Sequence, residues 1–456
     1  MRDRLIARFG IENSDNFEVL TIFDKKIDRE ILDKNNPILD SLSSKYSTAV
    51  WFERKMRDDF GIEIKGSFDN RPLLRHERFP AINPLRKDFD GKRVEFGDFK
   101  PYKYETVKGD GVFQVSVGPI HAGIIEPGHF HFSQSGERML HLEVRHFYTY
   151  RGIEKSLEGK DWFECKKSIE RISGNESIAY QIAWFDIFTQ ATQQEYPVEL
   201  KKYHCMLLEF ERVAHHLTDI GFIPNDAGFG AALAYASMMA EDVREMLKKI
   251  CSHRFGFEGV DFEVKGYDKE AVLKFVDELQ DKIEWFEDWI VDIPSLWDRF
   301  DTTGILSKKR ALKYGTVGVV ARASGVEIDT RNSEFYKSFG FALQSEKSGD
   351  VSARFKLRIK EIYNSITMIR NFIGGFDEVE KMVDFKDGEY MSFVESSIGE
   401  LFMYVRFKDN LVERFYVRDP SFINWQSLYL MMERDIIADF PLINKSCDLS
   451  YAGCDL

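Results

Sequence analysis

Side chains suited to proton chemistry gather in one short stretch, GPIHAGIIEPGH, which holds His121, Glu126 and His129. A neutral imidazole, or a carboxyl whose pKa is raised by burial, can pass a proton near neutral pH. Farther along the chain, Tyr180 offers a phenol that can donate a hydrogen bond to a carbonyl oxygen. We predict catalytic roles for Glu126, His129 and Tyr180. The plainer alternative is that the first three side chains only hydrogen-bond their own turn and that Tyr180 is a core residue.

Alternating apolar and polar residues flank this stretch, at 111–118 and 129–147, and predict two strands. Gly and Pro stand at both ends of the stretch, so a β-hairpin with a long tip is expected. Another strand is predicted at 17–24, and a helix within 37–62. Residues 63–100 are rich in Pro, Arg and Gly and show little periodicity, which indicates an extended loop.

Helical spacing of apolar residues dominates from 162 to about 300 and returns at about 350–373. Residues 389–418 alternate again and predict further strands. The tail, 440–456, has no clear period, and we expect it to be irregular.

The composition excludes several classes of protein. The chain has 456 residues and a net charge of −13, which argues against a nucleic-acid binder, because phosphates are bound by a basic surface. Five scattered cysteines do not form a disulfide framework and fit a reducing compartment. We find no signal-peptide pattern, no apolar stretch long enough to span a bilayer, and no glycine-rich phosphate loop. The 39 Phe predict a bulky core.

Two groups of motifs follow one another along the chain. The first is WFERKMRDDFGI followed by NPLRKDF, and it resembles the C-terminal signature of the smaller, C-class protein of complex I. The second comprises VGPIHAGIIEPGHFHF, YRGIEKSLEG, ERVAHHLTDIGF, ARASGVEIDTR, VESSIGE and RDPSFINWQSL. It resembles, in order, the motifs of the larger, D-class protein of complex I, which is homologous to the large subunit of [NiFe]-hydrogenases. The hairpin motif is most similar to energy-converting, membrane-bound hydrogenases and formate hydrogenlyase.

This resemblance to a fusion of the two complex I proteins implies an α+β fold. It predicts a truncated C-class α/β domain at 1–95 and a linker at 96–110. Residues 111–456 would form a mainly helical, hydrogenase large-subunit-like domain with peripheral β-hairpins.

The metal ligands of the hydrogenases are missing. Those enzymes hold nickel and iron with two CxxC pairs, and the first pair falls here on Ser173 and Glu176. The second falls on Ser421 and Asn424. Oxygen and amide groups do not suit such a centre, so no metal is expected. In complex I the vacated cavity becomes the head of a quinone tunnel, and we predict that these four residues and His121 line it. Glu176 would have to pair or take up a proton there, unless it is a polar plug.

The resemblance also assigns residues away from the cavity. Arg151 matches an arginine near the interface with an iron–sulfur subunit, although an ion pair with Glu154 is an equal alternative. His216 matches a family histidine facing the same region, whereas His215 is expected to be incidental. Cys447 and Cys454 are expected to be incidental thiols. Buried ion-pair scaffolding is the main expectation for a last group of motif residues, Arg322, Asp329, Arg331, Glu395 and Glu400.

The resemblance implies the large subunit of a membrane-associated oxidoreductase complex on the cytoplasmic side. Electrons would pass from a small iron–sulfur subunit to a quinone or a similar acceptor, coupled to ion movement by antiporter-like and H-class membrane proteins of the complex. The chain itself would bind no cofactor, and NAD would concern only complex I as a whole. The alternatives are a non-catalytic scaffold and, less favoured, an active hydrogenase. An open, polar cavity would favour the enzyme, and a cavity packed with Phe would favour the scaffold.

Overall fold

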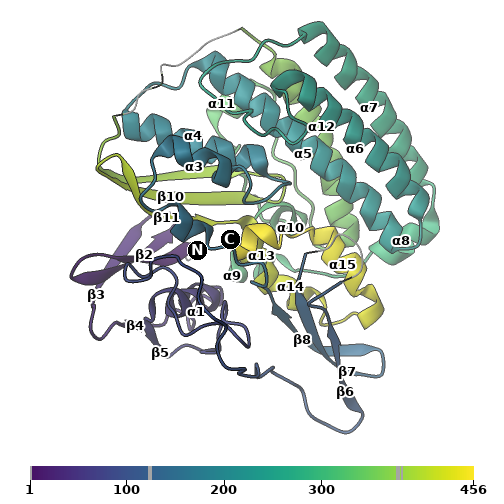
Figure 1. Ribbon diagram of the computed structural model, residues 1–456. Helices are drawn as coiled ribbons and strands as arrows, with labels where there is room; N and C mark the ends of the chain where they lie inside the picture. Colours follow the sequence, from purple (N-terminus) through teal and green to yellow (C-terminus); the bar gives the residue numbers. More distant parts are fainter. Residues whose placement is uncertain (1–2, 122–125, 376–380, 382–383) are drawn as a thin grey trace.

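The computed structural model describes residues 3–121, 126–375, 381 and 384–456 (Figure 1). The N-terminal part holds an antiparallel sheet of order β1-β2-β3, helix α1 and a parallel pair, β4 and β5. The strand predicted at 17–24 is β2, while the predicted helix is shorter than its window because β4 precedes it. The bounds are β1 Leu5–Glu12, β2 Asn16–Phe23, β3 Ile27–Asp33, β4 Ile38–Asp40, α1 Ala49–Phe60 and β5 Glu63–Lys65.

Helix α1 is tied to the rest of the chain by buried ion pairs. Lys55 Nζ lies 2.6 Å from Asp59 and 2.9 Å from Glu154. Glu154 in turn lies 2.7 Å from the Arg414 guanidinium on the central sheet. Breaking such a pair would leave an uncompensated buried charge, so these contacts fix the N-terminal part on the larger one.

The predicted hairpin is confirmed, but the stretch 129–147 forms two strands and not one. Strand β6 (Val112–Val117) pairs antiparallel with β7 (His129–Ser135), which pairs with β8 (Arg138–Arg145). Alternation along β7 turns Phe130 and Phe132 toward Phe440, and His129 and His131 toward Tyr104. The hairpin therefore has an apolar face against the C-terminal segment and a histidine face away from it.

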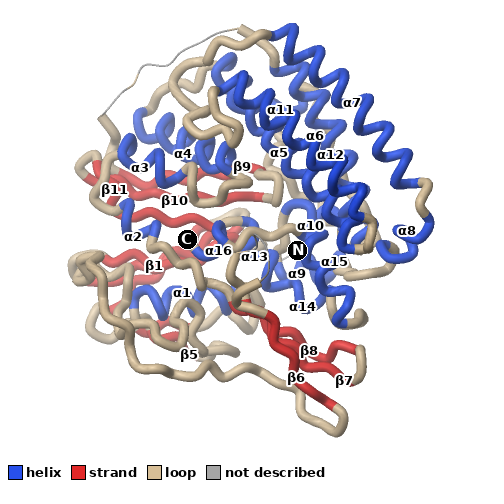
Figure 2. The backbone as a smooth tube through the Cα atoms, turned by 45° about the vertical axis from the view of Figure 1, so that its right-hand side comes forward, coloured by secondary structure: helices blue, strands red, loops and turns tan. Residues whose placement is uncertain are grey.

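Long helices form one side of the molecule (Figures 1 and 2). Helices α5 (Val198–Asp226), α6 (Gly230–Cys251), α7 (Lys269–Val291) and α12 (Val351–Phe372) pack side by side, as the helical spacing predicted. Among the described residues, no helix combines the length and the apolar character needed to cross a bilayer. The shorter helices are α2 Ile153–Leu157, α3 Trp162–Ile169, α4 Ser177–Thr192, α8 Pro294–Phe300, α9 Lys308–Tyr314, α10 Gly318–Ala323 and α11 Glu334–Ser338.

A central antiparallel sheet lies between α3 and α4 on one side and the N-terminal part on the other (Figure 2). Its order is β11-β10-β9, with bounds β9 Gly388–Glu395, β10 Glu400–Lys408 and β11 Leu411–Arg418. The strands predicted at 389–418 are confirmed. Strand β11 leads directly into α13 (Pro420–Asn424), which carries the end of the RDPSFIN motif.

The tail is not irregular, so that prediction was wrong. After α14 (Leu428–Met431) it forms α15 (Phe440–Cys447) and α16 (Ala452–Asp455). Pro441 stands in the first turn of α15, where its missing N–H is tolerated. Asp455 accepts hydrogen bonds from the backbone N–H groups of Phe147 at 2.7 Å and Thr149 at 3.0 Å. These bonds hold α16 in the interior, against α13.

Candidate functional site

The residues at the expected metal-ligand positions are all buried. Ser173 lies in the turn before α4, and its hydroxyl is 3.3 Å from Ser450 Oγ. Ser421 lies in α13, and its hydroxyl oxygen accepts a hydrogen bond from the Ser450 backbone N–H at 2.9 Å. Ser450 therefore joins the two positions through the C-terminal segment.

Asn424 bonds the backbone of Val317 through its side-chain amide. Its amide oxygen accepts from the Val317 backbone N–H at 3.0 Å, and its amide nitrogen donates to the Val317 carbonyl at 3.1 Å. This clamp holds the chain just before α10 against α13. With no sulfur in the set and these polar groups committed to protein partners, the residues do not fit a [NiFe] centre.

Two buried acids stand at the centre of this site, Glu176 and Asp419. Glu176 Oε1 accepts from the Ser396 hydroxyl, and Oε2 has no hydrogen-bond donor among the described residues. Asp419 Oδ2 accepts from the Tyr180 hydroxyl at 2.7 Å, and Oδ1 accepts from the Ser421 backbone N–H at 2.7 Å. Burial, and next the charge of Asp419, raise the pKa of Glu176 well above its usual range. Glu176 is therefore held as a neutral acid in contact with a second carboxyl.

The C-terminal segment fills the space in front of this acid pair. Gly453 lies against the Asp419 carboxylate, and a Cβ at position 453 would overlap it. Tyr180 is fully enclosed and points at Asp419. The catalytic role of Tyr180 stays a prediction; in this structure its hydroxyl bonds Asp419, and the tail occupies the space in front of the pair. The cavity is polar, as the enzyme hypothesis requires, but it is filled, and by the tail rather than by Phe.

The three hairpin residues separate into two roles. His121 Nε2 donates to the Gly128 carbonyl at 2.7 Å, and His129 Nδ1 donates to the Gly118 carbonyl at 3.2 Å. Glu126 is exposed and accepts from the Ala452 backbone N–H at 2.8 Å, on the tail. Only Glu126 is thus brought to the segment that covers the acid pair, while both histidines bond the hairpin itself. Residues 122–125, within the same motif, lie outside the described residues.

Arg151 and His216 are not neighbours. The Arg151 guanidinium donates to the carbonyls of Ile172 at 2.7 Å and Ala452 at 3.0 Å, so it ties the turn before Ser173 to the tail. It lies on the surface, beside an open cavity of about 760 Å³. His216 is fully buried and bonds Glu361 at 3.1 Å. Its predicted place at a partner interface is corrected accordingly, because its side chain does not reach the surface.

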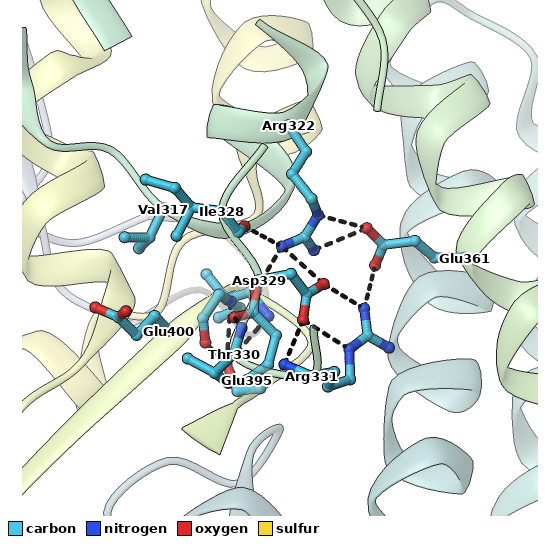
Figure 3. A network of polar contacts seen from close by, with 12 residues as sticks. Val317, Arg322, Ile328, Asp329, Thr330, Arg331, Glu361, Glu395 and Glu400 are labelled. Carbon is cyan, nitrogen blue, oxygen red and sulfur yellow. Dashed lines mark hydrogen bonds and ion pairs between the residues drawn. The ribbon is translucent and has the colours of Figure 1, made fainter. Parts of the chain in front are cut away.

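A buried ion-pair network confirms the scaffolding role of the motif residues (Figure 3). Arg322 Nη1 lies 2.5 Å from Glu395 and 3.2 Å from Asp329, and its Nε donates to Glu361 at 2.9 Å. Arg331 bonds Asp329 at 2.7 Å. Glu400 lies apart and pairs with Arg418 at 2.6 Å.

The network reaches the acid pair through Arg212. This arginine pairs with Glu209 at 3.0 Å and donates to the carbonyls of Glu395 and Ser396, each at 2.6 Å. Ser396 is the residue whose hydroxyl bonds Glu176. Burial is also the main cause that raises the pKa of Glu395 to about 7.

Several residues of the site escaped the sequence analysis. Asp419 lies two positions before Ser421 in the quoted motif RDPSFIN and was recognisable there. Ser396 and Arg212 also lie within quoted motifs, VESSIGE and ERVAHHLTDIGF, whereas Ser450 lies outside them. Their contacts with Glu176, Ser421 and the network arise only in the tertiary fold.

Replacing Glu176 by glutamine should change how stability depends on pH. Because its pKa is raised in the folded state, the contribution of Glu176 to the free energy of unfolding is fully present below its unfolded pKa, about 4.3. This contribution is lost as pH rises through the folded-state pKa. The glutamine cannot ionise, so the variant should match the wild type near pH ~4, below the unfolded pKa, and should be more stable than the wild type near pH ~8. Urea denaturation at each pH measures this. Glu334→Gln, at an exposed site, should leave the profile unchanged. Parallel profiles for wild type and Glu176→Gln would contradict the buried neutral acid.

Comparisons with known proteins agree with the motifs and with the α+β fold. Residues 2–95 match the model of the 30 Kd subunit of respiratory-chain NADH dehydrogenase, and residues 226–378 and 369–456 match that of its 49 Kd subunit. Formate hydrogenlyase subunit 5 of Escherichia coli is 27% identical over 443 residues, covering 93% of this chain and 78% of that protein. The fused C/D protein of the NADH-quinone oxidoreductase of Phocaeicola vulgatus is 24% identical over 480 residues, covering 98% and 91%.

A solved structure shares the fold. It is that of the membrane-bound sulfane sulfur reductase, an archaeal respiratory membrane complex, with a TM-score of 0.68 and 21% identity over 76% of this chain and 99% of that one. By their names the relatives are subunits of oxidoreductases, among them a formate hydrogenlyase, a membrane-bound hydrogenase and an NADH-quinone oxidoreductase. This chain belongs to the family of the 49 Kd subunit of respiratory-chain NADH dehydrogenase, with a 30 Kd-subunit domain fused before it.

Proposed function

We propose that this chain is the large subunit of a membrane-associated oxidoreductase complex that receives electrons from an iron–sulfur partner and reduces a quinone or a similar acceptor. Membrane proteins of the complex would couple this reduction to ion movement. Within the complex, the chain's own contribution is to hold and release protons at Glu176 and Asp419. The family, the membrane complexes among its relatives and the acid pair support this proposal.

The acid pair is the observation that carries the proposal. A cavity that only needed filling would be more stable with apolar side chains, because a buried carboxyl without a full set of partners is destabilising. Glu176 nevertheless keeps one oxygen without a donor among the described residues, beside a second carboxyl. Two buried carboxyls in contact, one of them with a raised pKa, are an arrangement that acid–base chemistry uses.

The chemistry needs two electrons and two protons for each quinone reduced to quinol. The electrons come from the partner's iron–sulfur cluster. The acceptor takes both electrons and two protons to become quinol; Glu176, which is held neutral, would supply a proton through the acid pair and would be reprotonated from solvent. Glu126 is exposed and bonds Ala452, the residue before the Gly453 that touches Asp419. The acceptor would therefore bind on the Glu126 side of the tail and not against Tyr180.

A scaffold role is the second candidate, and the filled cavity favours it. Ser450 and Gly453 occupy the space in front of the acid pair and bond the residues around it. In that case the chain would only position its partners, and the acids would be inert.

The test uses the complex purified with its native partners. Glu176→Gln and Asp419→Asn should each reduce steady-state quinone turnover about 100-fold, the usual size of a lost acid–base group. Assembly and reduction of the iron–sulfur cluster by the donor should stay as in the wild type. Asp186→Asn is the matched control, because Asp186 is a partly buried acid of α4 whose pKa is also raised by burial, but it bonds Ser392, away from the pair. Full turnover in both acid variants would contradict the proton-transfer role and favour the scaffold role.

A further inference from the structure

A second polar cluster lies between α5 and the C-terminal segment. His215, His216 and Asp219 of α5 are buried, and each offers one ligand atom, all within 4.8 Å of one another. Asp448, which follows α15, brings a further carboxylate, with Oδ2 3.0 Å from His215 Nε2. Asp219 Oδ2 lies 3.6 Å from His215 Nδ1. The imidazole of His215 thus stands between two carboxylates from different parts of the chain.

Four polar atoms of this cluster are unsatisfied. Both ring nitrogens of His215, Nδ1 of His216 and Oδ1 of Asp219 have no hydrogen-bond partner among the described residues. The approach of His215 Nε2 to Asp448 is close, but it lacks the geometry of a hydrogen bond. Buried polar atoms are nearly always paired, because an unpaired one carries its full desolvation penalty. Four such atoms in one cluster, on residues that all ligate metals, point to a bound cation.

The surroundings orient these groups in the way that metal sites use. His216 bonds Glu361 through Nε2 at 3.1 Å, which leaves Nδ1 free. Arg358 donates to Asp219 Oδ2 at 2.7 Å, which leaves Oδ1 free. Metal-bound histidines commonly give their second nitrogen to a carboxylate, and metal-bound carboxylates are themselves hydrogen-bonded.

We propose that His215, His216, Asp219 and Asp448 bind one divalent cation of the zinc class. Two imidazoles and two carboxylates suit Zn²⁺ and similar first-row ions, whereas Mg²⁺ and Ca²⁺ prefer oxygen ligands alone. This is not the position of the hydrogenase metals, since it lies on α5 and contains no thiolate. It also departs from the sequence-based expectation that the chain binds no metal, and it reverses the expectation that His215 is incidental.

The cation would fix the C-terminal segment. Asp448 is two residues from Ser450, which joins Ser173 to Ser421, and five from Gly453, which covers Asp419. A bound ion would therefore hold the cover of the acid pair against α5. This inference stands whether or not the acid pair moves protons.

The test is metal analysis of the full chain, purified without chelators and with no metal-affinity tag. We expect one zinc per chain, and after removal of metal we expect added Zn²⁺ to raise the midpoint of thermal unfolding. Co²⁺ in place of zinc should give the visible absorption of a four-coordinate site without a thiolate band. A thiolate band would overturn the assignment, because Cys447 would then be a ligand.

Variants locate the ion. His215→Gln should abolish stoichiometric zinc and the thermal response, while His204→Gln should keep both, because His204 is a buried histidine of the same helix outside the cluster. Equal zinc in the wild type and in His215→Gln would overturn the proposal. Absence of zinc and of any thermal response in the wild type would also overturn it, and would leave a protonated His215 as the partner of both aspartates. The Co²⁺ spectrum of the wild type keeps the test decisive if His215→Gln does not fold.

Discussion

Replacing Arg322 by leucine should lower the free energy of unfolding by about 3–5 kcal/mol, the usual result of removing one partner from a buried ion-pair network. Arg322 is fully buried and faces Asp329, Glu361 and Glu395 at once. Leucine would leave those carboxylates with too few cations in the interior. Each would then have to ionise without a partner or bind a proton. Urea denaturation of the purified chain, followed by tryptophan fluorescence, measures the loss.

The control separates burial from charge. Arg370→Leu removes an ion pair with Asp277 on the surface, where such pairs contribute about 0–1 kcal/mol. Arg322→Lys should fall between the two, because lysine keeps the charge but cannot donate in the fork that reaches three acids. Equal effects at 322 and 370 would show that the network is not a stabilising centre of this fold.

Most helices and strands were predicted correctly from the sequence, because periodicity and turn residues encode local structure. The hairpin between 111 and 147, the helices after 162 and the strands at 389–418 all follow from such local patterns. The helices of the tail were not predicted from periodicity because both are short. Helix α16 is also fixed by distant contacts, such as that of Asp455 with Phe147.

The site was harder to foresee for a physical reason. Proximity in the fold brings Glu176 beside Asp419, 243 positions later, and no local pattern encodes that approach. For Asn424 the motif position was informative but the expected contact was not found. It was predicted to line the cavity, and its amide instead bonds the backbone of Val317. The sequence predicted a catalytic role for Tyr180 but could not show that its hydroxyl bonds Asp419.

Gly318→Ala should destabilise the chain by about 3 kcal/mol, from two separate causes. Gly318 has φ of +65°, a conformation that costs other residues about 1–2 kcal/mol. A Cβ at this position would also overlap the Ile398 carbonyl and Gly399, and forcing extra atoms into a packed interior costs about 1–3 kcal/mol. The obstruction is backbone, so no side-chain rotation relieves it. The free energy of unfolding measured in urea gives the sum.

Gly66→Ala isolates the first cause, because Gly66 has φ of +74° and open space around it. Its effect should stay near the backbone contribution alone, about 1–2 kcal/mol. The second cause has a functional consequence, since the 396–399 turn that a methyl at 318 displaces carries the Ser396 hydroxyl bound to Glu176. Gly318→Ala should therefore also reduce turnover of the assembled complex, whereas Gly66→Ala should not. Equal destabilisation by the two substitutions, with turnover intact in both, would mean that the turn yields freely and that Ser396 does not position Glu176.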